Sequence, residues 1–362
     1  MKERYEKQRN IQIEIIRILA MFMIVLGHVF LYGDAAENVQ NSMTREIITA
    51  IKVFATPGTD IFVLISGYFL LNSKMSVKRI AILWLQILFY SVSLYLLMTV
   101  LGINTFSCKG LVTAFFPIAF NQYWFMRVYF YLVLCAPFLN ILLNSLNQEA
   151  HKYLILLGII LMVIPASIPG IALFNIEAGN GILWFMMLYS TGAYFSKYPP
   201  RHLARRYIIM AFICFIVAFL SREGISWLST SLGFAGKGES RFCTFDAFPI
   251  YAESCCLICA GIKMKLKIRH NCFVEKEILF LSESTAGVYM IHEHPLVRST
   301  IWKWLNLENH MIVYAIFITI FVFVACAMID QVTWKKILRY LRKIDTEKLD
   351  ALFDLKFKVS NE

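Results

Sequence analysis

Long apolar stretches separated by short polar segments run through the whole chain. Most of them are close to the twenty or so predominantly apolar residues that an α-helix needs to cross a bilayer. We therefore predict an all-α membrane protein with about ten transmembrane helices. The predicted spans cover residues 11–32, 48–72, 80–101, 122–143, 152–169, 181–196, 207–221, 246–262, 278–302 and 311–330.

The basic residues between these spans are distributed unequally on the two sides. If the N-terminus is cytoplasmic, the inner loops and the C-terminal tail hold 25 of the 35 Lys and Arg residues, the outer loops hold six, and four lie within spans. Cytoplasmic loops of membrane proteins carry such an excess. The pattern predicts that both termini are inside (N-in/C-in), which requires an even number of spans; eight spans is the alternative to ten.

Three segments follow from this topology. Residues 1–10 form a cytoplasmic N-terminus, residues 11–330 form the membrane domain, and residues 331–362 form a basic cytoplasmic tail. The tail alternates apolar and basic residues, which is typical of a helix lying on an anionic leaflet of membrane lipid. The first span contains Arg17 and ends without a small-residue cleavage site, so we interpret it as a retained helix and not a removed signal peptide.

Composition supports the membrane class. Hydrophobic residues make up 59% of the chain and charged residues 16%, which excludes an ordinary soluble domain. The net charge of +11 resides mainly in short loops, so it indicates topology and not a nucleic-acid partner. The nine cysteines show no paired CxxC motifs, and we expect neither a metal site nor a tightly bound cofactor.

Arg17 and His28 are the most informative ionisable residues. They are eleven positions apart on one predicted helix, so both project from the same face, about 16 Å apart along the axis. Ionisable side chains inside a membrane span usually face a cavity or a partner. The pair therefore indicates a polar path from the cytoplasmic side toward the outer half. Alternatively, Arg17 anchors the helix at the interface, paired with Glu14, and His28 bonds to a loop.

Other polar residues near the spans are weaker candidates. Lys78 and Arg79 form a cationic cluster at the cytoplasmic end of the predicted polar path. This cluster could bind phosphate groups, but the excess of basic residues in cytoplasmic loops explains it equally well. Trp124 fits an aromatic belt at the membrane–water interface. Arg127 lies deeper in the span, so its side chain must extend to the outer surface or meet a polar partner. Glu253 needs a proton or a cation such as Arg127 or Arg298.

The segment around His292 has the composition of a metal site but not the spacing. His292, Glu293 and His294 are adjacent, and neighbouring positions on a helix do not face one another. Pro295 loosens the turn before it and leaves His292 accessible to a cavity. We therefore interpret His292, with Arg127, Trp124 and Glu253, as residues that orient His28 or bind an acceptor.

Four motifs, in order along the chain, resemble the acyltransferase-3 family of integral-membrane O-acyltransferases. The first is Arg–X10–His, here Arg17 and His28. The others are the segments Phe62–Tyr68, Tyr123–Phe125 and Ser284–His292. The resemblance implies an acyl-CoA donor, commonly acetyl-CoA, with His28 in the catalytic position and Arg17 in the paired position. Many family members also have an Arg-x-x-Arg at the start of the third span. Here Arg79 in the SVKRI stretch fills one position, with Lys78 beside it, whereas Ser76 or Ile82 stands at the other.

These observations predict an O-acetyltransferase of the plasma membrane. It would transfer an acyl group from cytoplasmic acyl-CoA to a hydroxyl of a cell-surface glycan or its lipid-linked precursor. The alternative is a multi-span transporter of a small polar molecule or a lipid-linked glycan, because intramembrane Arg, His and Glu also suit ion-coupled transport. A non-catalytic scaffold leaves the deep ionisable residues unexplained. His28 would either remove the hydroxyl proton or carry the acyl group covalently, and the sequence does not separate these routes. The acceptor, the acyl chain, the residues that contact CoA and the oligomeric state also stay open.

Overall fold

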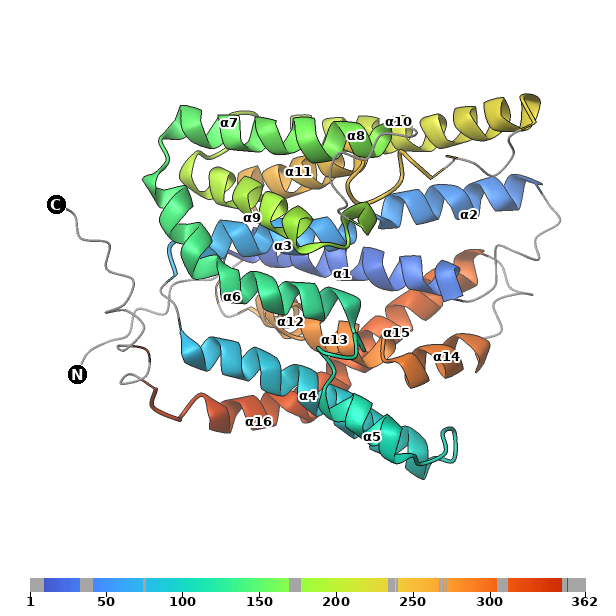
Figure 1. Ribbon diagram of the computed structural model, residues 1–362, viewed down its shortest axis with the longest axis vertical. Coiled ribbons are helices and arrows are strands. Elements are labelled where there is room, and N and C mark those ends of the chain that lie inside the picture. The colour runs from blue at the N-terminus through green and yellow to red at the C-terminus, as the bar shows by residue number, and fades with distance from the viewer. Residues whose placement is uncertain are drawn as a thin grey trace.

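The computed structural model describes residues 10–32, 42–73, 76–168, 177–233, 238, 240–266, 268, 270, 272–304, 312–346 and 350, and all its regular elements in these ranges are helical. The all-α prediction is therefore confirmed. The helices lie side by side in a bundle (Figure 1). The elements are α1 (Ile11–Tyr32), α2 (Ser42–Ala55), α3 (Gly58–Leu70), α4 (Val77–Val100), α5 (Cys108–Phe115), α6 (Trp124–Ser145), α7 (Gln148–Gly158), η1 (Ile159–Val163), α8 (Ile164–Ser167), η2 (Glu177–Gly179), α9 (Ile182–Lys197), α10 (Ala204–Ser231), α11 (Phe248–Lys263), α12 (Phe273–Glu283), α13 (Thr285–His292), α14 (Pro295–Trp304), α15 (Ile312–Val332) and α16 (Trp334–Leu341).

Helix α1 is the central element of the bundle. It contacts α2, α3, α11, α12, α13, α14 and α15, and many of its apolar side chains are buried. Asn10 precedes the helix, and its side-chain oxygen accepts a hydrogen bond from the Ile13 amide. A helix that is covered on most sides by other helices can carry polar side chains without exposing them to lipid. This position explains how Arg17 and His28 can lie on an otherwise apolar helix.

The second predicted span is broken at Pro57 and Gly58. Helix α2 ends at Ala55 and α3 begins at Gly58, because proline cannot continue the helical hydrogen bonds of the preceding turn. A β-carbon on Gly58 would lie 2.7 Å from the Ala20 carbonyl oxygen, so the glycine allows α3 to approach α1 closely. The break therefore sets how α3 packs against the central helix.

Helices α3 and α9 pack closely through two glycines. A β-carbon on Gly67 would collide with the Tyr189 carbonyl, and one on Gly192 would collide with the Leu64 carbonyl. Small residues at such contacts let two helix backbones come together, as in membrane helix pairs generally. Asn140 of α6 adds hydrogen bonds to the Leu70 carbonyl and, as acceptor, from the Tyr189 hydroxyl.

Two predicted continuous spans are interrupted. The segment predicted at 278–302 consists of α12, α13 and α14, with breaks at Ser284 and before Pro295. The segment predicted at 152–169 changes from α-helix to a π-type turn at Ile159–Val163, just before Pro165. Pro295 accounts for the break between α13 and α14, and Pro165 accounts for the π-type turn before it. In both cases the proline ring lacks the N–H and clashes with the preceding turn.

Seven helices of the described residues are long and apolar enough to cross a membrane. These are 11–32, 43–70, 77–100, 124–145, 148–167, 204–231 and 312–341. Helices α9 and α11 have 16 residues each, which corresponds to about 24 Å of rise and is less than a bilayer core. The count of ten spans and the N-in/C-in orientation therefore stay predictions.

The tail is only partly described. Helix α16 lies inside the predicted tail 331–362, whereas residues 347–349 and 351–362 lie outside the described residues, as do residues 1–9. Trp334 is 2% exposed, and its ring packs 5.6 Å from that of Phe89 on α4. The start of the tail thus packs one face against the bundle, and a contact of its other face with lipid stays a prediction.

We predict that Gly67→Ala destabilises the protein by about 1–3 kcal/mol, because the new methyl group meets backbone and not a movable side chain. Gly224→Ala is the matched control, since a β-carbon there has no described heavy atom within 4 Å. Thermal unfolding of the detergent-solubilised protein measures both. Equal melting temperatures for the two variants would contradict the packing at α3 and α9.

Candidate active site

His28 and His292 are hydrogen-bonded side chain to side chain. His28 Nδ1 lies 3.0 Å from His292 Nε2, and His292 Nδ1 lies 2.6 Å from the Val288 carbonyl oxygen. A carbonyl only accepts, so in a neutral His292 the proton is on Nδ1 and Nε2 is an acceptor. His28 must then donate from Nδ1. In the neutral form this leaves the His28 Nε2 lone pair available to take a proton.

A buried carboxylate completes the cluster. Glu293 is 1% exposed, and its Oε1 accepts hydrogen bonds from Arg298 at 2.6 Å and from the Tyr32 hydroxyl at 3.2 Å. Its Oε2 lies 3.2 Å from His28 Nδ1. A buried charge is stable only when it is paired and hydrogen-bonded, and Arg298 and Tyr32 meet that need here. Glu293 in turn favours a proton on His28 Nδ1.

Two adjacent residues converge on His28. Helix α13 ends at His292, and Glu293, its C-terminal capping residue, still has helical backbone. The expectation that these neighbouring positions do not face a common point is wrong, because both side chains are long enough to reach His28 Nδ1. His294 lies apart, with its ring 6.0 Å from that of Tyr123.

The same residues form a geometric candidate for a metal ion. Ligand atoms of His28, His292 and Glu293 lie within 4.8 Å of one another. The two imidazoles already share a hydrogen bond, and Arg298 already pairs with Glu293. A cation at this carboxylate opposes a second cation electrostatically. The hydrogen-bond pattern thus favours an oriented base over a metal centre.

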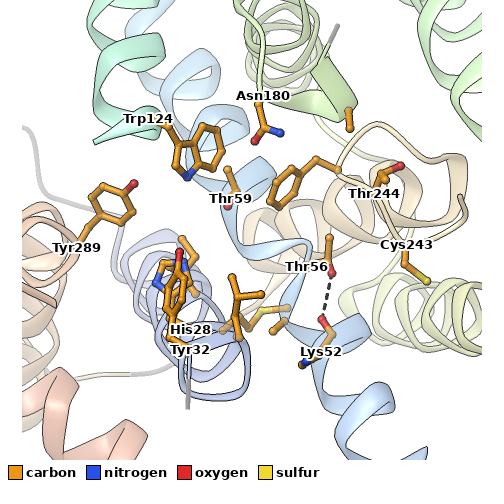
Figure 2. A pocket seen from close by; sticks show the side chains of 17 residues that line it. His28, Tyr32, Lys52, Thr56, Thr59, Trp124, Asn180, Cys243, Thr244 and Tyr289 are labelled. Carbon is orange, nitrogen blue, oxygen red and sulfur yellow. Dashed lines mark hydrogen bonds between the residues drawn. The ribbon is translucent and has the colours of Figure 1, made fainter. Parts of the chain in front are cut away.

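Two cavities lie beside α1, and each contains one residue of the Arg17–His28 pair. The His28 cavity, of about 430 Å³, is lined by His28, Tyr32, Thr56, Thr59, Trp124 and Tyr289, among others. Figure 2 shows these side chains reaching the cavity from several helices. The Arg17 cavity, of about 290 Å³, is lined by Arg17, Phe62, Ser66, Tyr129, Lys335 and Arg342, among others.

Ile24 and Tyr289 line both cavities. They form a shared wall between the space near Arg17 and the space near His28. Ile24 is about 10 Å of helix rise from Arg17 and four residues before His28. Neither of these two cavities reaches both Arg17 and His28, so the continuous polar path stays a prediction.

The remaining predicted site residues divide into two groups. Trp124 lines the His28 cavity, and Arg17 pairs with Glu14 at 2.6 Å, as the spacing predicted. Arg127 and Glu253 line neither cavity. Each has a buried polar atom, Nε and Oε2 respectively, without a hydrogen-bond partner among the described residues.

The cation proposed for Glu253 is engaged elsewhere. Arg298, one of the two cations offered for Glu253, pairs with Glu293 instead, which leaves a proton or Arg127 as the alternatives. The sequence analysis missed Arg298, Tyr32 and Glu293 as members of the His28 cluster. Tyr32 lies four residues after His28 on α1, and that helical spacing is the signal that could have indicated it.

Lys78 and Arg79 lie at the start of α4 and do not line the Arg17 cavity. Lys78 Nζ donates to the carbonyls of Arg342 and Ile344, at 2.7 and 2.5 Å. Arg79 donates to the Ser73 hydroxyl at 3.0 Å and lines a separate small cavity. Their predicted role in donor binding is not tested by these contacts.

A family model described as an acyltransferase domain matches residues 10–330. The chain belongs to the acyltransferase-3 family. Comparisons with curated proteins and with solved structures found no significant match. Family membership and the apolar helices together support a membrane acyltransferase, and the His28 cluster lies within the matched acyltransferase-3 region.

We predict that Arg298→Met destabilises the protein by about 2–3 kcal/mol, because it leaves the Glu293 carboxylate buried without its cation. The double variant E293Q/R298M recovers part of that loss. Arg222→Met is the control, since its partner Glu223 is 28% exposed and such pairs contribute about 1 kcal/mol or less. Equal melting temperatures for Arg298→Met and Arg222→Met would contradict the buried pairing.

Proposed function

We propose that this protein is an O-acetyltransferase of the plasma membrane. It moves an acetyl group from cytoplasmic acetyl-CoA to a hydroxyl of a cell-surface glycan or its precursor. The observation that carries the proposal is the hydrogen bond from His28 to His292 beside a cavity, with a second cavity behind the same wall. Two cavities that share one wall would give a donor and an acceptor separate approaches to His28.

The reaction follows from the tautomer of His28. The acceptor hydroxyl attacks the thioester carbonyl carbon while His28 Nε2 removes the hydroxyl proton. The carbon–sulfur bond then breaks, the acyl–oxygen bond remains, and the leaving thiolate takes the proton from His28. His292 and Glu293 act as positioning residues, because they hold the proton on His28 Nδ1 and do not themselves contact the substrates.

The His28 cavity has the chemistry of a sugar site. The rings of Trp124 and Phe245 lie 5.9 Å apart, and both line the cavity with Thr56, Thr59 and Asn180. Aromatic faces pack against the C–H faces of a sugar ring, while hydroxyl and amide groups bond its hydroxyls. A pocket that is mostly apolar with a few polar groups is the usual form of a small-molecule site.

The wall between the cavities adds a constraint. For the thioester to reach His28, the side chains of Ile24 and Tyr289 must move apart or let the narrow arm of the donor pass between them. Both side chains are buried, Ile24 at 8% and Tyr289 at 4% exposure, so this movement requires local repacking around them. In the proposed reaction the wall separates donor and acceptor until it opens.

We predict that His28→Ala lowers kcat for acetyl transfer by about 10²–10⁴-fold, because it removes the general base. His202→Ala is the control, since His202 is exposed on the surface. The assay measures acetyl-group transfer from radiolabelled acetyl-CoA to surface glycan in membranes. Wild-type turnover in a folded His28→Ala variant contradicts the proposal, as does substrate accumulation in vesicles without consumption of acetyl-CoA.

His292 provides a test of positioning. His292→Phe removes the acceptor for His28 Nδ1–H and should lower kcat about tenfold or more, with an unchanged KM for acetyl-CoA. His292→Gln offers a side-chain carbonyl to the same hydrogen bond and should retain more activity. Equal kcat values for the two variants, or a change in KM alone, would contradict this role.

A chelator distinguishes the base from a metal centre at the same residues. If His28 acts as a base, prolonged treatment with EDTA leaves the transfer rate unchanged. Loss of activity that added Zn²⁺ restores would assign the cluster to a metal instead.

A further inference from the structure

Two cations of the Arg17 cavity come from the tail, beyond the region that matches the acyltransferase family. Lys335 and Arg342 line this cavity together with Arg17, whereas the family match ends at residue 330. Neither residue was predicted to bind a substrate from the sequence, since the tail read as a membrane-surface helix. The tail therefore contributes side chains to a cavity within the membrane domain.

The contacts of the tail hold these two side chains in place. Lys335 Nζ donates to the Glu283 carbonyl at 2.6 Å, and the Lys78 ammonium binds the carbonyls of Arg342 and Ile344. An ammonium group at the last carbonyls of a helix stabilises that helix end. Lys78, with buried Trp334, therefore fixes the end of α16 so that Arg342 faces the cavity.

The charges around the cavity are not equally satisfied. Arg17 pairs with Glu14 at 2.6 Å, and Lys335 lies 3.8 Å from Asp330. Glu283 also lines the cavity as its acidic side chain. The Arg342 guanidinium, in contrast, has no ion pair with any carboxylate in the described part of the chain. A guanidinium that lines a cavity without a carboxylate partner suits a phosphate group, which it can bind through two N–H donors.

We infer that Arg342 and Lys335, with Arg17, bind the phosphate groups of the acyl donor. The inference rests on the proposed function, and it names the tail as part of the donor site. From Arg17 the distance along α1 to His28 is about 16 Å, so phosphates held here leave an extended arm to carry the thioester past Ile24 and Tyr289. The same cations could instead bind the phosphate of a lipid headgroup, and the experiment separates these two sources.

The test measures binding of radiolabelled CoA to the full-length protein in nanodiscs of neutral phosphatidylcholine. Arg342→Gln and Lys335→Gln should each raise the Kd for CoA about tenfold. The matched controls are Arg339→Gln and Lys336→Gln, which remove the same charge from exposed positions of α16 outside the cavity. The controls should change the Kd less than about twofold, and Arg342→Lys, which keeps the charge, should bind better than Arg342→Gln.

Several results would overturn the inference. Equal Kd values for Arg342→Gln and Arg339→Gln in folded proteins would remove the tail from the donor site. An effect of Arg342→Gln seen only in nanodiscs with anionic lipid would assign the site to a lipid headgroup. Both results leave the proposed function intact if the wild-type protein binds CoA and transfers acetyl groups. If the wild-type protein neither binds CoA nor transfers acetyl groups, the proposed function itself is refuted.

Discussion

The structure depends on keeping the Glu293 carboxylate buried in a mainly apolar bundle. A buried carboxylate costs several kcal/mol unless cations and hydrogen-bond donors surround it. Arg298 and Tyr32 bind one of its oxygens, and His28 faces the other. This requirement draws α1, α13 and α14 together at one point. The imidazole orientation of His28 follows from the same set of contacts.

Side-chain reach and the start of a separate helix make this cluster possible. His292 and Glu293 are adjacent on backbone that is still helical, and Glu293 N–H donates to the Tyr289 carbonyl. Both side chains nevertheless reach His28, His292 through Nε2 and Glu293 through Oε2, and Arg298 joins them from α14. The break at Pro57 lies beside the His28 cavity, which Thr56 and Thr59 line. Irregular backbone inside a membrane bundle is tolerated where it borders a cavity, as it does here.

Much of the architecture could be predicted from hydrophobic pattern, and much of the site could not. The apolar stretches predicted the helical class, and the spacing of Arg17 and His28 predicted that both lie on one face of a helix. In the structure each of these two residues lines a cavity. The role of Arg298 could not be predicted, because its partner Glu293 was assigned to an intact helix. Lys335 and Arg342 were missed because the basic pattern of the tail fits a membrane surface equally well. Pairings between distant segments depend on tertiary packing, which local pattern does not encode.

The central claim is that a donor held on the Arg17 side presents its thioester to His28 across the wall of Ile24 and Tyr289. A structure of the protein with a non-hydrolysable acetyl-CoA analogue tests it most directly. We expect the phosphates beside Arg17 and Arg342, the analogue passing between Ile24 and Tyr289, and its acyl carbon about 3–4 Å from where an acceptor hydroxyl bonded to His28 Nε2 would lie. An analogue bound with its acyl group away from His28, or with its phosphates in the His28 cavity, would contradict the account.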